Sequence, residues 1–130
     1  MMRLLVVLFL SLLGMGFCGT AFAEKPTVEQ PIAVLRALDK VTGRVEEIEV
    51  NIEKPYRFGT IFITAHSCRV TTPEETPEAA VFLDVSEFKS GREEMSVFRG
   101  WMFASSPSLS AMEHPVYDLW LIGCKDKMAN

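Results

Sequence analysis

Residues 33–52 read AVLRALDKVTGRVEEIEVNI, and this stretch decides the fold class. Two apolar-rich arms flank the polar connection 39–44, in which Gly43 can adopt the positive φ of a tight turn. In the second arm apolar and polar residues alternate, which is typical of an antiparallel strand with one buried face. The stretch therefore predicts a β-hairpin. The apolar positions of the second arm are Ile48, Val50 and Ile52, and the polar positions between them are Glu47, Glu49 and Asn51.

The chain beyond this hairpin continues the strand pattern. Thr71–Glu78 carries three carboxylates and no apolar residue, which predicts a mobile acidic loop. Ser105–Pro107 offers a helix start and Pro115 a stop, so one short helix is expected between the last two strands. These features predict an all-β fold, an antiparallel β-sandwich or open barrel of about six to seven strands with one short helix. The further strand segments are 60–70, 79–88, 95–103 and 116–124.

The first 23 residues have the three regions of a secretory signal peptide. Arg3 gives a positive start, Leu4–Phe17 is an apolar run, and Ala21–Ala23 forms the A-x-A cleavage pattern. The run is too short for a membrane helix, which needs about 20 apolar residues. The large Phe17 in front of Cys18 also argues against lipoprotein processing. We expect a periplasmic or secreted protein, cleaved after Ala23, with no stable membrane insertion after signal cleavage.

The remaining chain has the composition of one small globular domain. The sequence of 130 residues is 48% hydrophobic and 23% charged, which excludes a disordered polyampholyte. Residues 24–32 predict an extended lead-in that need not be ordered, 33–124 a single β domain, and 125–130 a polar tail. Removal of Arg3 leaves 12 basic and 17 acidic residues, a formal charge of −5. This acidic balance argues against nucleic acid and anionic lipid as partners; the oligomeric state stays open.

Two cysteines remain after signal cleavage, Cys68 and Cys124. In an exported domain a disulfide between them is the leading interpretation, and closing this loop would stabilise the fold by roughly 4 kcal/mol on the chain-entropy model. One alternative is a pair of buried free thiols. The other is a metal site, because an extended strand would point His66 and Cys68 to the same face. No C-x-x-C or H-x-x-H spacing organises these residues with His114, so neither a metal nor another cofactor is expected.

The apolar connection between Gly100 and Asp118 is the candidate binding surface. One interpretation is a plug in which the short helix closes one end of the sandwich and buries the aromatic residues. The functional interpretation leaves one or two rings exposed to a partner, with polar groups around them whose loss costs little stability. Trp120 is expected in the core, on the strand face of Cys124. The candidate surface residues are Trp101, Phe103, Ser105, Ser106, Glu113, His114, Tyr117 and Asp118.

A small hydrolase is the weakest functional hypothesis. It would use one of four serines as nucleophile, with His114 as base and Asp118 as its orienting group; the serines are Ser105, Ser106, Ser108 and Ser110. No G-x-S-x-G elbow is present, and no glycine lies between Gly100 and Gly123 to shape an oxyanion hole. We therefore expect no catalytic residues and no enzyme activity.

The function expected from the sequence is a non-catalytic accessory or protein-binding module of the cell envelope, with an envelope protein as partner. The alternative from another class is a glycan-binding module that stacks sugar rings on exposed aromatic side chains. Trp101, Tyr117 and Trp120 are the candidates for that role. The two hypotheses differ in which of these rings are exposed.

Five motifs together resemble a known family. They are LDKVTGR at 38–44, Phe58-Gly59 ahead of a strand that ends at Cys68, GWMFASSP at 100–107, EHPVYD at 113–118, and the closing Cys124. This combination resembles an alphaproteobacterial secreted family known only as a domain of unknown function, and it covers almost all of residues 33–124. The resemblance implies an exported single-domain protein with paired cysteines. It supplies no catalytic residue, substrate or cofactor.

Overall fold

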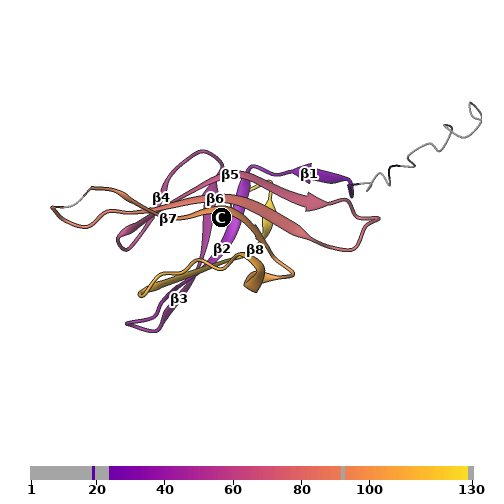
Figure 1. The fold of residues 1–130 in the computed structure, drawn as a ribbon. Coiled ribbons are helices and arrows are strands. Elements are labelled where there is room, and N and C mark those ends of the chain that lie inside the picture. Colours follow the sequence, from indigo (N-terminus) through magenta and orange to yellow (C-terminus); the bar gives the residue numbers. More distant parts are fainter. Residues whose placement is uncertain (1–18, 20–23, 92, 129–130) are drawn as a thin grey trace, which may run out of the picture.

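The structure, a computed structural model, describes Gly19, residues 24–91 and residues 93–128. Two antiparallel sheets pack face to face (Figure 1). The large sheet has the order β1-β5-β6-β7, with β4 also paired to β5, and the small sheet has the order β3-β2-β8. The predicted all-β sandwich is thereby confirmed. The strands are β1 (Thr27–Glu29), β2 (Ile32–Asp39), β3 (Arg44–Asn51), β4 (Tyr56–Phe58), β5 (Ile61–Thr71), β6 (Ala79–Glu87), β7 (Met95–Phe103) and β8 (Tyr117–Lys125).

The hairpin that decides the fold class forms as predicted. β2 and β3 pair without interruption from Ile32 opposite Asn51 to Asp39 opposite Arg44. Gly43 takes a φ of 72° in the connecting turn. The expected helix is a single 3-10 turn, η2 (Pro107–Ser110), with the proline at its start. The predicted signal peptide falls on residues 1–23, which, apart from Gly19, lie outside the described residues.

The lead-in is partly structured, which the sequence did not predict. β1, inside residues 24–32, pairs with the end of β5, with Glu29 opposite Arg69. All three residues of β1 are exposed. An edge strand without a buried face leaves no apolar alternation in the sequence, and so the pattern that identified the other strands is absent here.

The core fills the space between the two sheets. Along the whole of β6, and along β5 as far as Ala65, every second residue is buried and points inward. The residues between them are half-buried and point outward. Facing residues of β2, β3 and β8 close the core from the small sheet. The largest fully buried side chains are Leu35, Val50, Ile61, Ile63, Cys68, Val81, Leu83 and Val85.

Two β-bulges bring the cysteines together. In β5 the register against β6 shifts between Ala65 and Ser67, so His66 is the extra residue. In β8 the register against β2 skips Ile122, which is the extra residue there. A one-residue insertion moves the following side chains to the other face of the strand. Cys68 and Cys124 consequently point inward from opposite sheets.

The predicted disulfide joins the two sheets. Cys68 and Cys124 are bonded with a Cα–Cα distance of 5.8 Å, and Cys68 is fully buried. Because of the bulges, His66 does not share the face of Cys68, and Trp120 does not share the face of Cys124. The expectation that Trp120 belongs to the core is therefore wrong: Leu119 and Leu121 point inward, and Trp120 lies half-buried on the outer side.

Candidate functional site

The eight residues of the predicted surface do not form one patch. Trp101 and Phe103 lie on the outer face of the large sheet, where Trp101 is 39% exposed. His114 and Tyr117 are buried. The remaining four lie near η2 or at its flanks: Ser105 and Glu113 are exposed, and Ser106 and Asp118 are half-buried.

His114 is part of a buried hydrogen-bond network, not of an exposed rim. It is 9% exposed, and its Nδ1 accepts hydrogen bonds from the backbone N–H groups of Val116 at 3.0 Å and Tyr117 at 3.1 Å. A backbone N–H can only donate, so the network assigns the ring hydrogen to Nε2. Nε2 then donates to Oε2 of Glu87 at 2.8 Å. The expectation that His114 sits at a solvated rim is thus corrected.

Glu87 connects this network to the start of β5. Its Oε2 also accepts a hydrogen bond from the Thr60 hydroxyl at 3.0 Å, and Lys89 lies 3.5 Å from Oε1. Burial raises the pKa of Glu87, but the hydrogen bonds from Thr60 and His114 and the charge of Lys89 outweigh it. The pKa is lowered below its usual range, so the carboxylate stays ionised in the folded protein near neutral pH.

Tyr117 explains the Phe58-Gly59 motif. Gly59 has a φ of 58°, and a Cβ built there would lie 2.1 Å from the Tyr117 hydroxyl oxygen. That oxygen accepts a hydrogen bond from the Thr60 N–H at 3.3 Å. The Tyr117 ring also stacks on His114 at 5.2 Å between ring centroids. Tyr117 is therefore a structural residue and offers no platform for a sugar ring.

The Ser-His-Asp arrangement considered from the sequence does not assemble. Both ring nitrogens of His114 are engaged, one by backbone N–H groups and the other by Glu87. Asp118 forms an ion pair with Lys40 at 3.3 Å, and Lys40 also donates to the His114 carbonyl at 2.7 Å. The groups expected to activate a serine thus hold the segment 114–118 against its neighbours.

The outer face of the large sheet carries aromatic side chains at positions that usually hold polar residues. Phe82 and Trp101 lie opposite each other on β6 and β7, with ring centroids 5.4 Å apart. Phe62 and Phe88 form a second edge-to-face pair at 6.1 Å. Phe103 follows Trp101 by two residues and shares its face. We call this set the aromatic face: Phe62, Phe82, Phe88, Trp101 and Phe103.

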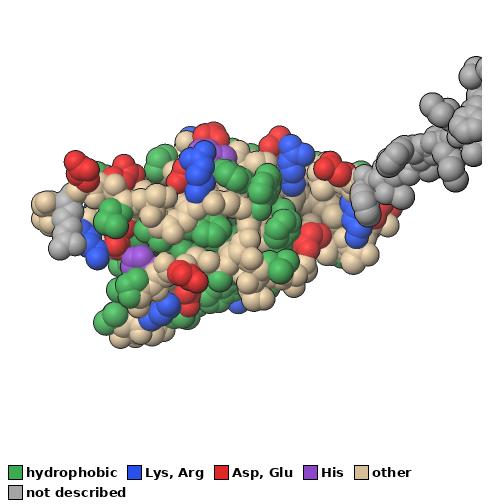
Figure 2. All heavy atoms as spheres, viewed as in Figure 1, with side chains coloured by type: hydrophobic (Ala, Val, Ile, Leu, Met, Phe, Trp, Pro, Cys, Tyr) green, Lys and Arg blue, Asp and Glu red, His purple; other side chains and the backbone are tan. Residues whose placement is uncertain are grey.

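Charged groups accompany the aromatic face. The Arg99 guanidinium lies 5.8 Å from the ring centroid of Phe82, and that of Arg57 lies 5.9 Å from Phe62, both within cation–π distance. Arg99 is also paired with Asp84 at 2.9 Å. Figure 2 shows hydrophobic side chains between acidic and basic ones along this side of the molecule. Aromatic and arginine side chains together are the composition of protein-binding hot spots.

Most of this face was not predicted from the sequence: of its five residues, only Trp101 and Phe103 belong to the predicted surface. A signal was present in β6, where Val81, Leu83 and Val85 form the buried side of the alternation. Phe82 falls on the other side, together with Asp84, where a polar residue is expected. An aromatic residue at one of the outward-facing positions of an alternating strand indicates an apolar side chain on the outer face of the sheet.

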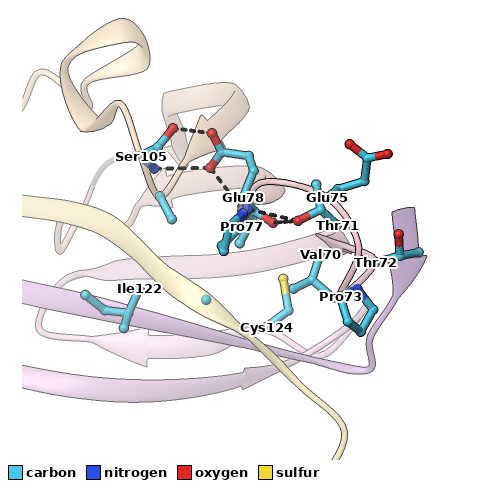
Figure 3. A pocket seen from close by; sticks show the side chains of 13 residues that line it. Val70, Thr71, Thr72, Pro73, Glu75, Pro77, Glu78, Ser105, Ile122 and Cys124 are labelled. Atoms are coloured by element: carbon cyan, nitrogen blue, oxygen red, sulfur yellow. Dashed lines mark hydrogen bonds between the residues drawn. The ribbon is translucent and has the colours of Figure 1, made fainter. Parts of the chain in front are cut away.

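A pocket of about 480 Å³ opens between the acidic loop 71–78 and the end of β8 (Figure 3). We call it the loop pocket. Apolar residues from both sheets line most of it, and two carboxylates, Glu75 and Glu78, stand on its loop side. The apolar lining residues are Val70, Pro73, Pro77, Ala79, Ala104, Ile122 and Cys124.

Glu78 ties the acidic loop to the segment after β7. Its Oε1 accepts hydrogen bonds from the backbone N–H groups of Ala79 at 2.9 Å and Ser105 at 3.1 Å, and the Ser105 hydroxyl donates to Oε2. Burial raises the pKa of Glu78, but the hydrogen bonds from Ser105 and Ala79 outweigh it and lower the pKa. The loop predicted as mobile is also closed by Thr71, whose hydroxyl accepts a bond from the Glu78 N–H at 3.0 Å.

Across residues 24–91 and 93–128, no group of three or more His, Cys, Asp or Glu side chains could hold a metal ion. In the same part of the chain, no helix is long and apolar enough to cross a membrane.

Comparison with known proteins places the chain among bacterial proteins. Residues 33–124 match the family described as "Uncharacterized protein conserved in bacteria (DUF2155)". An uncharacterized protein of Rickettsia prowazekii, RP359, is 33% identical over 88 residues. That similarity covers 68% of this chain and 57% of the relative, so the chain spans little more than half of the relative's length. No solved structure is significantly similar to the chain.

Proposed function

Since the chain belongs to the DUF2155 family of uncharacterized bacterial proteins, we propose a function from its surface: it is a non-catalytic accessory module of the cell envelope that binds a protein partner. The aromatic face is the observation that carries this proposal. Five aromatic side chains occupy outward positions of one sheet, although burying them in the core would be favourable. Phe88 and Trp101 are exposed and the other three are half-buried, so a partner that covers this face would bury further apolar area.

The geometry of the aromatic face suits a protein partner. Phe82 is held by Trp101 on one side and has Arg99 over its ring. Rigid aromatic residues with few rotatable bonds lose little conformational entropy on binding, and arginine can bind both rings and carboxylates. Asp84 compensates the charge of Arg99 on this face, which favours specificity over long-range attraction.

The proposed compartment is the periplasm or the exterior of the cell. The Cys68–Cys124 disulfide supports a location outside the reducing cytoplasm. The signal peptide predicted from residues 1–23 gives the route of export. Cleavage following Ala23 would leave all eight described strands intact, because β1 begins at Thr27.

Site-specific crosslinking in cells tests the proposal. A photo-reactive phenylalanine analogue is placed at position 101 on the aromatic face, and for control at Val45, which is 54% exposed on the small sheet. We expect a discrete protein adduct from position 101, and its loss when Phe82→Ser removes the neighbouring ring. The same adducts from both positions, or an adduct insensitive to Phe82→Ser, would contradict the proposal.

A glycan-binding module is the second candidate, and the exposure of Trp101 favours it. Trp101 lies beside Asp84 and Arg99, a carboxylate and a guanidinium that can bind sugar hydroxyls. Trp120 is only half-buried, on the outer side of the small sheet, whereas Tyr117 is buried. Quenching of tryptophan fluorescence by acrylamide, with and without soluble peptidoglycan fragments, distinguishes the two. Glycan binding would be favoured if the fragments protect tryptophan from quenching, and if this protection is lost in Trp101→Ala but retained in Trp120→Ala.

A further inference from the structure

The edge of β8 beside the loop pocket is open for pairing. Among the described residues β8 pairs only with β2, so its other edge is unpaired. Gly123 lines the pocket and has no side chain, which means that the strand backbone itself forms this wall. A Cβ added at Gly123 would meet no atom within 4 Å. An unpaired strand edge next to a pocket is the geometry that accepts an additional strand.

The pocket offers an apolar wall and an unengaged negative charge. Ile122, the bulge residue of β8, is 39% exposed at the pocket. Glu75 stands on the loop that lines the pocket (Figure 3), and its carboxylate forms no hydrogen bond or ion pair with another described residue, whereas both oxygens of Glu78 are bound to Ser105. The nearest cation on β8, Lys125, is paired with Glu49 on the small sheet.

We propose that the loop pocket binds an extended peptide segment of a partner protein by strand addition to β8. The bulge at Ile122 interrupts the edge, so the new pairing runs over Gly123–Lys125. One apolar side chain of the segment enters the pocket against Ile122, and a lysine or arginine of the segment lies at Glu75. Backbone hydrogen bonds supply affinity, while the pocket and the charge select the sequence.

Charge complementarity decides which extended segment fits. The acidic loop places Glu74, Glu75 and Glu78 within five residues, and the chain without its signal peptide has a formal charge of −5. A basic segment is attracted to this rim and an acidic one is repelled. This site is separate from the aromatic face: it lies on other residues, and either proposal can fail without the other.

Three labelled, end-blocked heptapeptides test the strand-addition proposal, with binding followed by fluorescence anisotropy and by amide shifts in NMR spectra. Their sequences alternate valine with lysine, valine with glutamate, and serine with lysine. We expect the valine–lysine peptide to bind about tenfold or more tightly than the other two and to shift the amides of residues 122–125. Equal binding of the serine–lysine peptide would indicate unspecific charge attraction, and absence of binding would also overturn the proposal.

Three variants localise the binding. Glu75→Lys should weaken binding of the valine–lysine peptide about tenfold. The matched control Glu94→Lys, in the exposed segment before β7, should leave the affinity within about twofold of the wild-type value. Gly123→Phe should block the edge while the protein stays folded, since the added side chain enters open space. Unchanged affinity in both Glu75→Lys and Gly123→Phe would overturn the proposal. Phe82→Ser, which tests the aromatic face, should leave peptide affinity unchanged.

Discussion

Replacing His114 by alanine tests whether this residue is a buried structural group, as its contacts indicate. The substitution would remove three hydrogen bonds: it leaves the N–H groups of Val116 and Tyr117 without their acceptor, and Oε2 of Glu87 keeps only its bond from Thr60. Each buried polar group left unsatisfied costs about 1 to 3 kcal/mol, and part of this is recovered where water enters. Including the lost packing on Tyr117, we expect His114→Ala to lower the free energy of unfolding by about 3 to 5 kcal/mol.

Urea unfolding of the mature, oxidised protein measures this effect. The neighbouring Glu113 is the matched control, because its side chain is exposed, and Glu113→Ala should change stability by less than about 0.5 kcal/mol. His114→Asn should lie between wild type and alanine, since the Asn oxygen can take the place of Nδ1 but cannot reach Glu87. A loss below about 1 kcal/mol for His114→Ala would refute the reasoning, because it would mean that the network contributes little.

Three further results are expected. Gly59→Ala should cost about 3 kcal/mol or more, because a Cβ there collides with Tyr117, while Gly43→Ala, with open space around it, should cost about 1 kcal/mol in the same unfolding assay. Cys68→Ser should lower the free energy of unfolding by roughly 4 kcal/mol, and alkylation of unfolded wild-type protein that begins at Glu24 should, without reductant, add no label. Because the pKa of both Glu87 and Glu78 is lowered in the folded state, their stabilisation is complete above about pH 4.3, the ordinary glutamate value, and is lost as pH falls through the lower folded values. Thermal unfolding from pH 7 to 2.5 should show this, and Glu87→Gln should flatten the profile.

The alternation of apolar and polar residues along short segments was sufficient to predict most of the strands. The strands of the first hairpin follow from the pattern around Ile48 and Val50, because a half-buried antiparallel strand leaves a period of two in the sequence. The predicted signal peptide and the two cysteines that follow it were sufficient to predict the disulfide. These features depend on short segments or on counts, and the sequence displays both directly.

The face of the sheet on which an individual side chain lies could not be predicted in the same way. A single extra residue, Ile122, reverses the orientation of everything that follows it in β8, and no residue type in the sequence marks that bulge. His114 is buried because it meets Glu87, which lies 27 positions away on β6. A polar residue in a loop is expected at the surface unless its partner is known, and that partner is set by tertiary structure.

The two connections between the sheets lie near opposite ends of β5. The disulfide holds Cys68 to β8, and eight residues earlier Thr60 joins the network of Glu87 and His114. At a rise of about 3.3 Å per residue, the two points are roughly 26 Å apart along the strand. Sheets fixed to each other at both ends cannot slide or open without breaking a covalent bond or a buried hydrogen-bond network. The outer surfaces are therefore free to carry exposed aromatic and strand-edge positions, because their residues are not needed to hold the sandwich together.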